Sequence, residues 1–131
     1  MKSKISLLTL GTEDIKRAAV FYKALGFVVH GEEDEDHVMF KAEGTWLALY
    51  SKNLYEKEMG IAPTGEFSGV VMAHNVGSKE GVDEVMEEAR AAGGKIVKEA
   101  YETYWGGYAG YFQDPDGHVW SAAWNPFTDL T

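Results

Sequence analysis

Cysteine is absent from this sequence, which excludes disulfides, thiolate nucleophiles, zinc–thiolate sites and iron–sulfur clusters. Long apolar runs are missing as well, because no stretch reaches the roughly 18 residues that a transmembrane helix needs. The apolar segment near the start of the chain is short and has no small-residue cleavage site behind it. We therefore expect no signal peptide, and a cytoplasmic location is the default expectation.

Positive charge is scarce: 12 Lys and Arg residues face 21 Asp and Glu residues, which gives a net charge of −9. Such a surface repels phosphate backbones, so a nucleic-acid partner is not expected. It keeps a cytoplasmic protein soluble, and it would also tolerate or attract a cationic small molecule. The chain has 131 residues, of which 45% are apolar, and this is typical of one globular domain over residues 1–131.

An internal repeat is the strongest structural signal. Two stretches place apolar residues at the spacing of an amphipathic helix: Ile15, Ala18, Ala19, Tyr22 and Leu25 in the first half, and Val82, Val85, Met86, Ala89 and Ala92 in the second. Each residue of the second set lies 67 positions after its counterpart. Gly26 and Gly93 follow as left-handed C-caps. Thr12 or Asp14 begins the first helix and Ser78 begins the second.

Strand-like runs flank both helices in the same order. They are residues 5–10, 27–30, 38–41 and 45–50 in the first half, and 69–76, 95–101, 108–113 and 118–124 in the second. Both halves therefore read as strand, helix, strand, strand, strand. The sequence predicts an α+β fold of two tandem βαβββ modules, at about residues 1–52 and 67–131. The polar connection between them, at about residues 53–66, is a linker or a flap.

One segment of the second module has no counterpart in the first. Gly44 and Gly117, which precede the last strand of each copy, are 73 positions apart instead of 67. About six residues are thus added in the second copy, and the segment there, residues 101–108, is unusually aromatic. Its Gly106-Gly107 pair supplies a hinge. The segment is either an aromatic lid over a ligand or an ordinary packing or dimer surface.

Two motifs resemble a known family. Residues 13–26, where Phe21 and Tyr22 precede Leu25-Gly26, resemble the first helix of the vicinal oxygen chelate (glyoxalase, bleomycin resistance protein and extradiol dioxygenase) superfamily. Residues 111–120, with Asp-Pro-Asp-Gly at 114–117, resemble its final hairpin. The resemblance implies a curled mixed sheet around a cleft, with the helices outside. It also implies a homodimer in which modules of different chains complete a site.

The resemblance implies a divalent ion held by one residue from the opening strand and one from the closing strand of each module. Register places these positions at Ile5 and Val71, five residues before the end of each opening strand, and at Ala48 and Ser121, four residues after the turn glycines. A dication needs oxygen or imidazole donors, and a neutral serine hydroxyl alone does not hold one. We therefore expect no metal and no other cofactor.

The four histidines form no ligand pair at metal-binding spacing. His74 and His118 lie at odd spacing from positions 71 and 121, so they are expected to face the helices or solvent. His30 is expected to be an ordinary strand or edge residue. The position of His37 is open, because its strand lacks a register marker.

Strand parity places mostly apolar side chains inward together with Ile5, Ala48, Val71 and Ser121: Leu7, Thr9, Trp46, Tyr50, Gly69, Ala73, Asn75, Val119 and Ala123. The set contains no carboxylate and no base. The inserted segment adds Tyr101, Tyr104, Trp105 and Tyr108 near one end of the sheet. The predicted ligand-binding wall is Leu7, Thr9, Trp46, Ala48, Tyr50, Asn75, Trp105, Tyr108 and Ser121, with the catalytic residues unknown.

Such a wall suits a planar or apolar small molecule, or a cationic one through contacts with aromatic rings. The function expected from the sequence is a metal-free binding protein similar to bleomycin-resistance-type proteins that sequester antibiotics or xenobiotics. An alternative is a metal-dependent glyoxalase-like lyase or isomerase, or a dioxygenase relative. Its functional residues would then lie at positions other than those that the strand register predicts. A third possibility is a regulatory or assembly module. Neither nucleic acid nor membrane is an expected partner.

Overall fold

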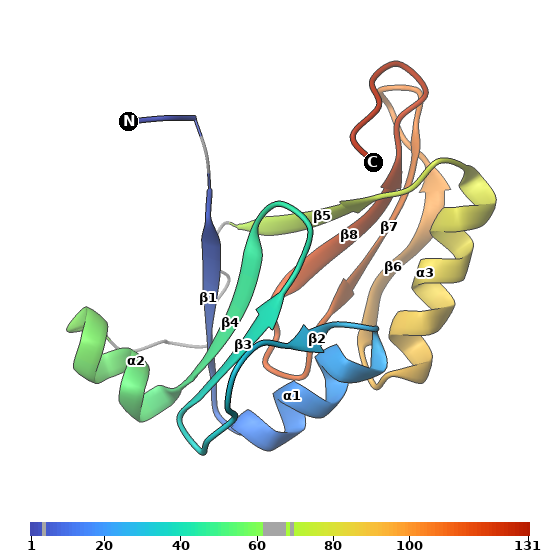
Figure 1. Cartoon of the computed structure of the whole chain (residues 1–131). Coiled ribbons are helices and arrows are strands. Elements are labelled where there is room, and N and C mark those ends of the chain that lie inside the picture. Colours follow the sequence, from blue (N-terminus) through green and yellow to red (C-terminus); the bar gives the residue numbers. More distant parts are fainter. Residues whose placement is uncertain (4, 62–67, 69) are drawn as a thin grey trace. The chain divides into compact units, whose positions relative to one another are not determined.

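The computed structural model describes residues 1–3, 5–61, 68 and 70–131, and within them it contains eight strands and three helices (Figure 1). The chain divides into two compact units, residues 1–65 and 66–131. We call these units module one and module two and describe each by itself. Among the described residues, no helix combines the length and the apolar character needed to cross a membrane.

Module one contains a four-stranded mixed sheet. Its elements are β1 (Leu7–Thr12), α1 (Ile15–Ala24), β2 (Val28–Val29), β3 (His37–Lys41), β4 (Trp46–Ser51) and α2 (Lys52–Met59). The strand order is β1-β4-β3-β2, with β1 parallel to β4 and the other pairs antiparallel. The parallel pair arises because α1, β2 and β3 bring the chain back before β4 pairs with β1.

Module two repeats this topology. Its elements are β5 (Val71–Asn75), α3 (Lys79–Ala91), β6 (Lys95–Glu102), β7 (Tyr108–Gln113) and β8 (Val119–Trp124). The strand order is β5-β8-β7-β6, with β5 parallel to β8. The predicted duplication of a βαβββ unit is confirmed.

In module one, α1 packs on one face of the sheet. The ring of Tyr22, which is fully buried, lies 6.0 Å from the ring of Phe40 on β3. Phe40 is the register partner of Leu47 on β4, so both side chains project toward α1. This apolar layer is the core of the module.

In module two, α3 packs in the same way. Val82, Met86 and Ala89 are its buried residues. A Cβ atom at Gly110 on β7 would come within 2.8 Å of the Met86 sulfur, so the glycine leaves room for the methionine. The contact between Gly110 and Met86 shows that the even-numbered residues of β7 face α3.

The two helices differ in length, which changes the repeat. α1 has 10 residues and α3 has 13, so α3 begins 64 positions after α1 and ends 67 positions after it. Asp14 is the N-cap of α1 and Ser78 is the N-cap of α3. Gly26 and Gly93 both have φ of 100°, as predicted for the left-handed ends of the helices.

The connection between the modules, which the sequence indicated as a linker or a flap, begins with a helix. It contains α2, whose N-cap Ser51 accepts a hydrogen bond from the Leu54 backbone N–H at 3.1 Å. Gly60 ends this helix with φ of 74°. Residues 62–66 of the predicted connection lie outside the described part of the chain.

Candidate functional site

Each sheet has a face turned away from its long helix, which we call its far face. On β1 and β4 of module one, Leu7 is opposite Trp46 and Thr9 is opposite Ala48. Leu47 and Leu49 of β4 point toward α1, and successive side chains of a strand point to opposite faces. Leu7, Thr9, Trp46 and Ala48 therefore project from the far face. Tyr50 belongs to the same alternation. The structure therefore places all five predicted wall residues of module one on one face.

Two histidines that were not predicted to belong there also lie on this face. His37 is the register partner of Tyr50, and their ring centroids are 5.4 Å apart. The ring of His30 lies 4.8 Å from that of Trp46. The face therefore carries two imidazoles, where the sequence had predicted no base. The signal that could have found His37 is the buried alternation of Val38 and Phe40 on the same strand.

The far face of module two follows from the same pairing. Asn75 is opposite Ala123, and Ser121 is flanked by Ala73 on β5 and Tyr111 on β7. The Ser121 side chain is largely covered, with 7% of the residue exposed. Asn75 and Ser121 thus share a face as predicted, while Gly69 lies outside the described residues.

A tyrosine pair adjoins Ser121 on this face. Burial, together with the neighbouring phenols of Tyr101 and Tyr104, raises the pKa of Tyr111. Lys98 is the register partner of Tyr111, and its ammonium lies 3.8 Å from the centre of the Tyr101 ring. From the sequence, Tyr101 belonged to a segment that was either a lid or a packing surface, and neither Tyr111 nor Lys98 was predicted to line the site.

Tyr108 lies on the opposite side of this sheet. Its hydroxyl donates to Asp83 Oδ1 of α3 at 2.9 Å. The ammonium of Lys79, also on α3, lies 5.8 Å from the ring of Tyr108 and 5.8 Å from that of Trp124. Tyr108 was predicted to belong to the ligand-binding wall, but even-numbered positions of β7 project toward α3, so Tyr108 does not share a face with Ser121.

The aromatic segment folds back on its own turn. The backbone N–H of Gly107 donates to Thr103 Oγ1 at 2.9 Å, and the Trp105 ring lies so close to Gly107 that a Cβ there would be 2.0 Å from it. Phe127 packs against Gly106 in the same way. Trp105 remains 37% exposed, and Tyr104 is fully exposed. Trp105 is therefore held by local packing within module two.

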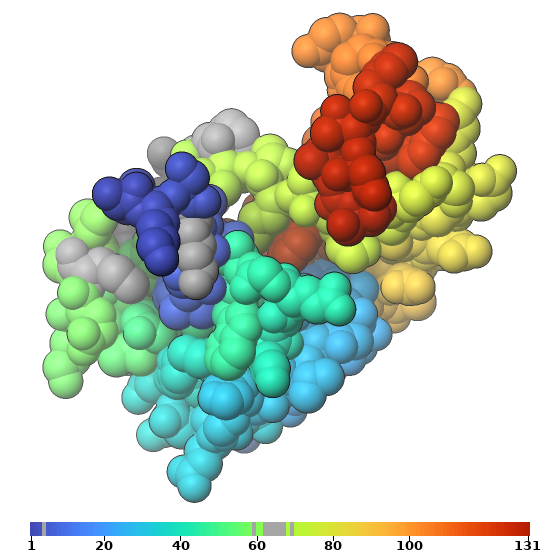
Figure 2. Space-filling view, turned by 45° about the horizontal axis from the view of Figure 1, so that its top comes forward, coloured from blue at the N-terminus to red at the C-terminus, as the bar shows by residue number. Residues whose placement is uncertain are grey.

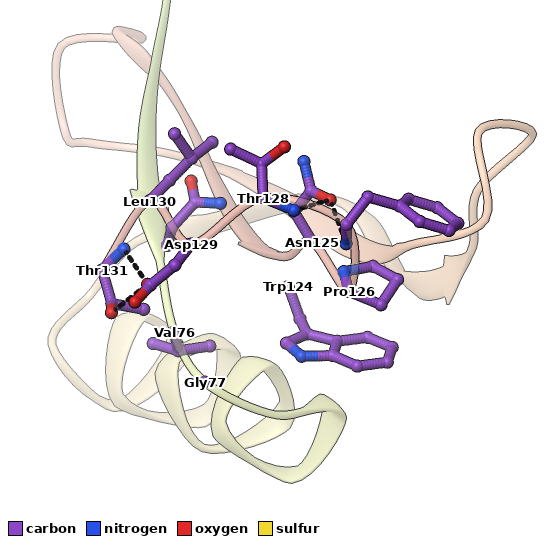
Figure 3. A pocket seen from close by; sticks show the side chains of 11 residues that line it. Val76, Gly77, Trp124, Asn125, Pro126, Thr128, Asp129, Leu130 and Thr131 are labelled. Atoms are coloured by element: carbon purple, nitrogen blue, oxygen red, sulfur yellow. Dashed lines mark hydrogen bonds between the residues drawn. The ribbon is translucent and has the colours of Figure 1, made fainter.

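A hollow of about 410 Å³ lies at one end of module two, between residues 75–77 and 124–131. Figure 2 shows the red C-terminal segment beside the yellow-green link from β5 to α3. Figure 3 places Trp124 and Pro126 on one side of the hollow and Asp129 on the other. Of the predicted wall residues, Asn75 lines it.

The polar groups of this hollow are largely paired within the C-terminal segment. Asn125 Oδ1 accepts from the backbone N–H groups of Phe127 and Thr128 at 2.9 and 3.2 Å. Hydrogen bonds from the side chain and backbone of Thr131 lower the pKa of Asp129. The hollow is thus shaped by the packing of the chain end, and the far faces remain the candidate site.

The described positions at which the family resemblance implies metal ligands do not carry a set of donors for a divalent ion. In the observed register Ala48 is opposite Thr9 and Ser121 is opposite Ala73, so the equivalent of Val71 in module one is Leu7 and not Ile5. Leu7 replaces Ile5 as the equivalent position because α3 is three residues longer than α1. The opening strands β1 and β5 are therefore 64 positions apart in the sequence, and not 67. Leucine, valine and alanine have no donor atom, so this set does not fit a dication.

The described residues also contain no group of three or more His, Cys, Asp and Glu side chains arranged to hold a metal ion. His30 and His37 pair with aromatic rings. What the far faces offer instead is apolar and aromatic surface with isolated hydroxyl, amide, imidazole and ammonium groups. Such a surface orients an organic ligand.

Comparison with known proteins gives a consistent picture. Residues 4–122 match the family model of the Glyoxalase/Bleomycin resistance protein/Dioxygenase superfamily. The chain is similar to a glyoxalase-related enzyme from Fulvimarina pelagi, with 30% identity and a TM-score of 0.89, over 98% of this chain and 93% of that one. A glyoxalase/bleomycin resistance protein/dioxygenase from Nocardioides is 26% identical, with a TM-score of 0.80, over 100% of this chain and 89% of that one.

More distant relatives share the fold alone. Lactoylglutathione lyase from Agrobacterium tumefaciens is 20% identical, with a TM-score of 0.74, over 95% of this chain and 96% of that one. No curated protein matches the sequence significantly. The family match spans most of the chain and agrees with its duplicated βαβββ topology. The chain therefore belongs to the glyoxalase/bleomycin resistance protein/dioxygenase superfamily.

Proposed function

We propose that this protein binds a small organic molecule without a metal ion and sequesters it, as bleomycin-resistance-type proteins do. The observation that carries the proposal is the chemistry at Leu7, Ala48, Val71 and Ser121. These positions provide three apolar side chains and one hydroxyl. A Lewis-acid centre at these positions would lack its ligands, whereas an apolar ligand would find contact surface.

The aromatic residues of the far face give such a ligand its principal contacts. Trp46 and Tyr50 are both half-buried on module one, with Ala48 in the same strand between them. A half-buried indole offers a flat apolar surface, and Thr9 supplies a hydroxyl in the adjacent strand. These features favour a planar ligand.

Metal analysis and ligand binding together test the proposal. We expect purified protein to contain far less than one equivalent of Ni, Zn, Fe or Mn per chain by elemental analysis. A thermal-shift screen of diverse antibiotics and aromatic compounds is expected to give ligands that bind equally well with and without chelator. Mass spectrometry of the recovered ligand should show it unchanged. A stoichiometric transition metal, or conversion of the ligand, would overturn the proposal.

A second candidate is a glyoxalase-like lyase or isomerase, or a dioxygenase relative. The observation that favours it is His37, whose imidazole lies on the far face and is the kind of group that serves as a general base. The 30% identity to a glyoxalase-related enzyme points the same way. This candidate predicts bound metal after purification and an activity that chelator abolishes.

We also propose that the two modules act together as one domain of a cytoplasmic homodimer. The open edges of β1 and β5 support association, because Leu7 is 39% exposed, Val71 is 44% exposed and Val70 is 56% exposed. Apolar edge strands are normally covered by another surface. Analytical ultracentrifugation tests the dimer, a single unfolding transition tests the one-domain assignment, and subcellular fractionation tests the location.

A further inference from the structure

We propose that the far face of module two recognises the carboxylate of an organic acid, using Lys98, Tyr111 and Ser121. The inference rests on the proposed binding function and specifies the charge of the ligand. It differs from the expectation drawn from composition, because the net charge of −9 by itself favours a cationic ligand.

The charges of module two are segregated between the two sides of its sheet. Glu99 on β6 pairs with Arg90 of α3 at 2.7 Å, and Glu102 pairs with Lys79, so both carboxylates lie on the α3 side. The register places Lys95 and Lys98 on the far face, opposite Gln113 and Tyr111. Among the residues of β5, β6, β7 and β8, all of them described, no Asp or Glu belongs to the far face. A negative group is therefore favoured there.

Four strands align the polar groups in one row. Lys98, Tyr111, Ser121 and Ala73 are successive register partners on β6, β7, β8 and β5. Because neighbouring strands lie about 4.8 Å apart, the row spans about 14 Å, with the polar side chains toward the β6 end and Ala73 at the β5 end. Ala73 and Ala123 are small and apolar, so they leave room for the body of the ligand beside the hydroxyls.

The tyrosine pair retains a donor for the ligand. Tyr111 follows Lys98 in the row, Tyr101 lies beside Lys98, and each phenol has one O–H that can donate to an acceptor. The Ser121 hydroxyl is the next donor in the row. An ammonium and two hydroxyls converging on one carboxylate make charge-assisted hydrogen bonds, which are stronger than neutral ones.

The aromatic rings of module two are less available to a cation. The ammonium of Lys98 lies over the ring of Tyr101 at 3.8 Å. The ammonium of Lys79 lies 5.8 Å from the rings of Tyr108 and Trp124. The Tyr101 ring on the far face thus already contacts a cation of the chain, whereas Tyr108 and Trp124 lie on the α3 side, outside the proposed site. The same contact holds the Lys98 head group beside Tyr101, where it faces the tyrosine pair.

A matched set of naphthalene probes tests the inference on the full-length protein. Isothermal titration calorimetry would compare 2-naphthoate, the neutral 2-naphthamide and the cationic 2-naphthylmethylammonium, which share the same ring system. We expect the carboxylate to bind about tenfold more tightly than the amide, and the ammonium to bind most weakly. Lys98→Met and Tyr111→Phe should each weaken naphthoate binding about fivefold while leaving naphthamide binding unchanged.

Two further variants serve as controls. Lys98→Arg retains the charge and should retain most of the preference for the carboxylate. Lys16→Met removes an equal charge from an exposed position on α1 and should change nothing. Circular dichroism establishes that each variant is folded.

Three outcomes would overturn the inference: equal affinities for the three probes, tighter binding of the ammonium compound, or binding to none of them. The inference would also be overturned if Lys98→Met kept the wild-type preference for the carboxylate over the amide. Each result leaves the proposed binding function to be judged by the compound screen and the metal analysis, which do not depend on ligand charge.

Discussion

The indole of Trp120 stacks on the ring of Phe112 in module two, with the centroids 6.3 Å apart and the planes inclined by 3°. Both residues are on the α3 side of the sheet, where Phe112 is buried. Trp46 of module one lies on the far face of its own sheet, beside His30. The two tryptophans therefore have different roles, because Trp120 packs on buried Phe112 on the α3 side and Trp46 belongs to the candidate site.

Alanine substitutions should separate these roles. Trp46→Ala is expected to weaken binding of the best ligand from the compound screen about tenfold, because it removes a planar contact, while the protein stays folded. Trp120→Ala should lower the free energy of unfolding by about 2–4 kcal/mol, because it leaves a cavity over Phe112. Urea unfolding followed by circular dichroism, together with calorimetric titration, measures both effects. Unchanged affinity in Trp46→Ala would place the ligand elsewhere.

The fold was largely predictable because each βαβββ unit repeats its apolar pattern. β7 was predicted at residues 108–113, the bounds it has in the structure. The predicted starts of β1 and β5 were early by two residues, at 5 and 69 instead of 7 and 71. Apolar residues continue past the end of hydrogen-bonded pairing, so composition does not define where a strand begins.

The site was less predictable, because its residues depend on pairing between strands. The alternation of Val38 and Phe40 assigns the face of His37, but its pairing with Tyr50 depends on the register between β3 and β4, which no apolar pattern encodes. The interaction of Tyr111 with Tyr101 depends on the irregular register between β6 and β7. The sequence placed Trp105 in the predicted ligand-binding wall. Its packing against Gly107 depends on the conformation of the turn, which the sequence pattern did not predict.

Gly107→Ala should disturb the aromatic segment selectively. The new methyl group would lie 2.0 Å from the Trp105 ring and 2.6 Å from the carbonyl oxygen of Trp124, so the indole must move and the backbone must shift. We expect a loss of about 1–3 kcal/mol in the free energy of unfolding and a red shift in the tryptophan fluorescence. Gly77→Ala is the matched control, because nothing lies within 4 Å of its Cβ position. Equal stability of the two variants would contradict the packing of Trp105.

Ser51→Ala should loosen α2. The Ser51 hydroxyl accepts from the Leu54 backbone N–H at 3.1 Å and donates to Asp36 Oδ1 at 2.7 Å. Losing an N-cap of this kind costs about 1 kcal/mol. Hydrogen exchange is expected to increase at Leu54 and nearby amides of α2, with little change in α1. Ser51→Asp supplies a cap but repels Asp36, so it should restore protection only in part.

The pair formed by Tyr108 and Asp83 should make stability depend on alkaline pH. The hydrogen bond to Asp83, reinforced by burial and by the Asp83 charge, raises the pKa of Tyr108 above its usual value of about 10. A pKa raised on folding contributes stability that is fully present below about pH 10 and is lost as the pH rises through the folded value. Tyr108→Phe should therefore lower the free energy of unfolding by about 1 kcal/mol or less at neutral pH.

The difference between wild type and Tyr108→Phe should stay constant from neutral pH to about pH 9.5 and shrink above it, as urea midpoints at each pH would show. Absorbance at about 295 nm gives a direct check, because it follows phenolate formation at a pKa near 10. Tyr108→Phe should remove a late-titrating tyrosine, and Asp83→Asn should move that tyrosine to lower pH by removing the carboxylate charge. If Tyr108→Phe instead removed a tyrosine that titrates at the usual pH, the hydrogen bond to Asp83 would not hold the phenol in its protonated form. In that case α3 would be attached to β7 by its apolar contacts alone.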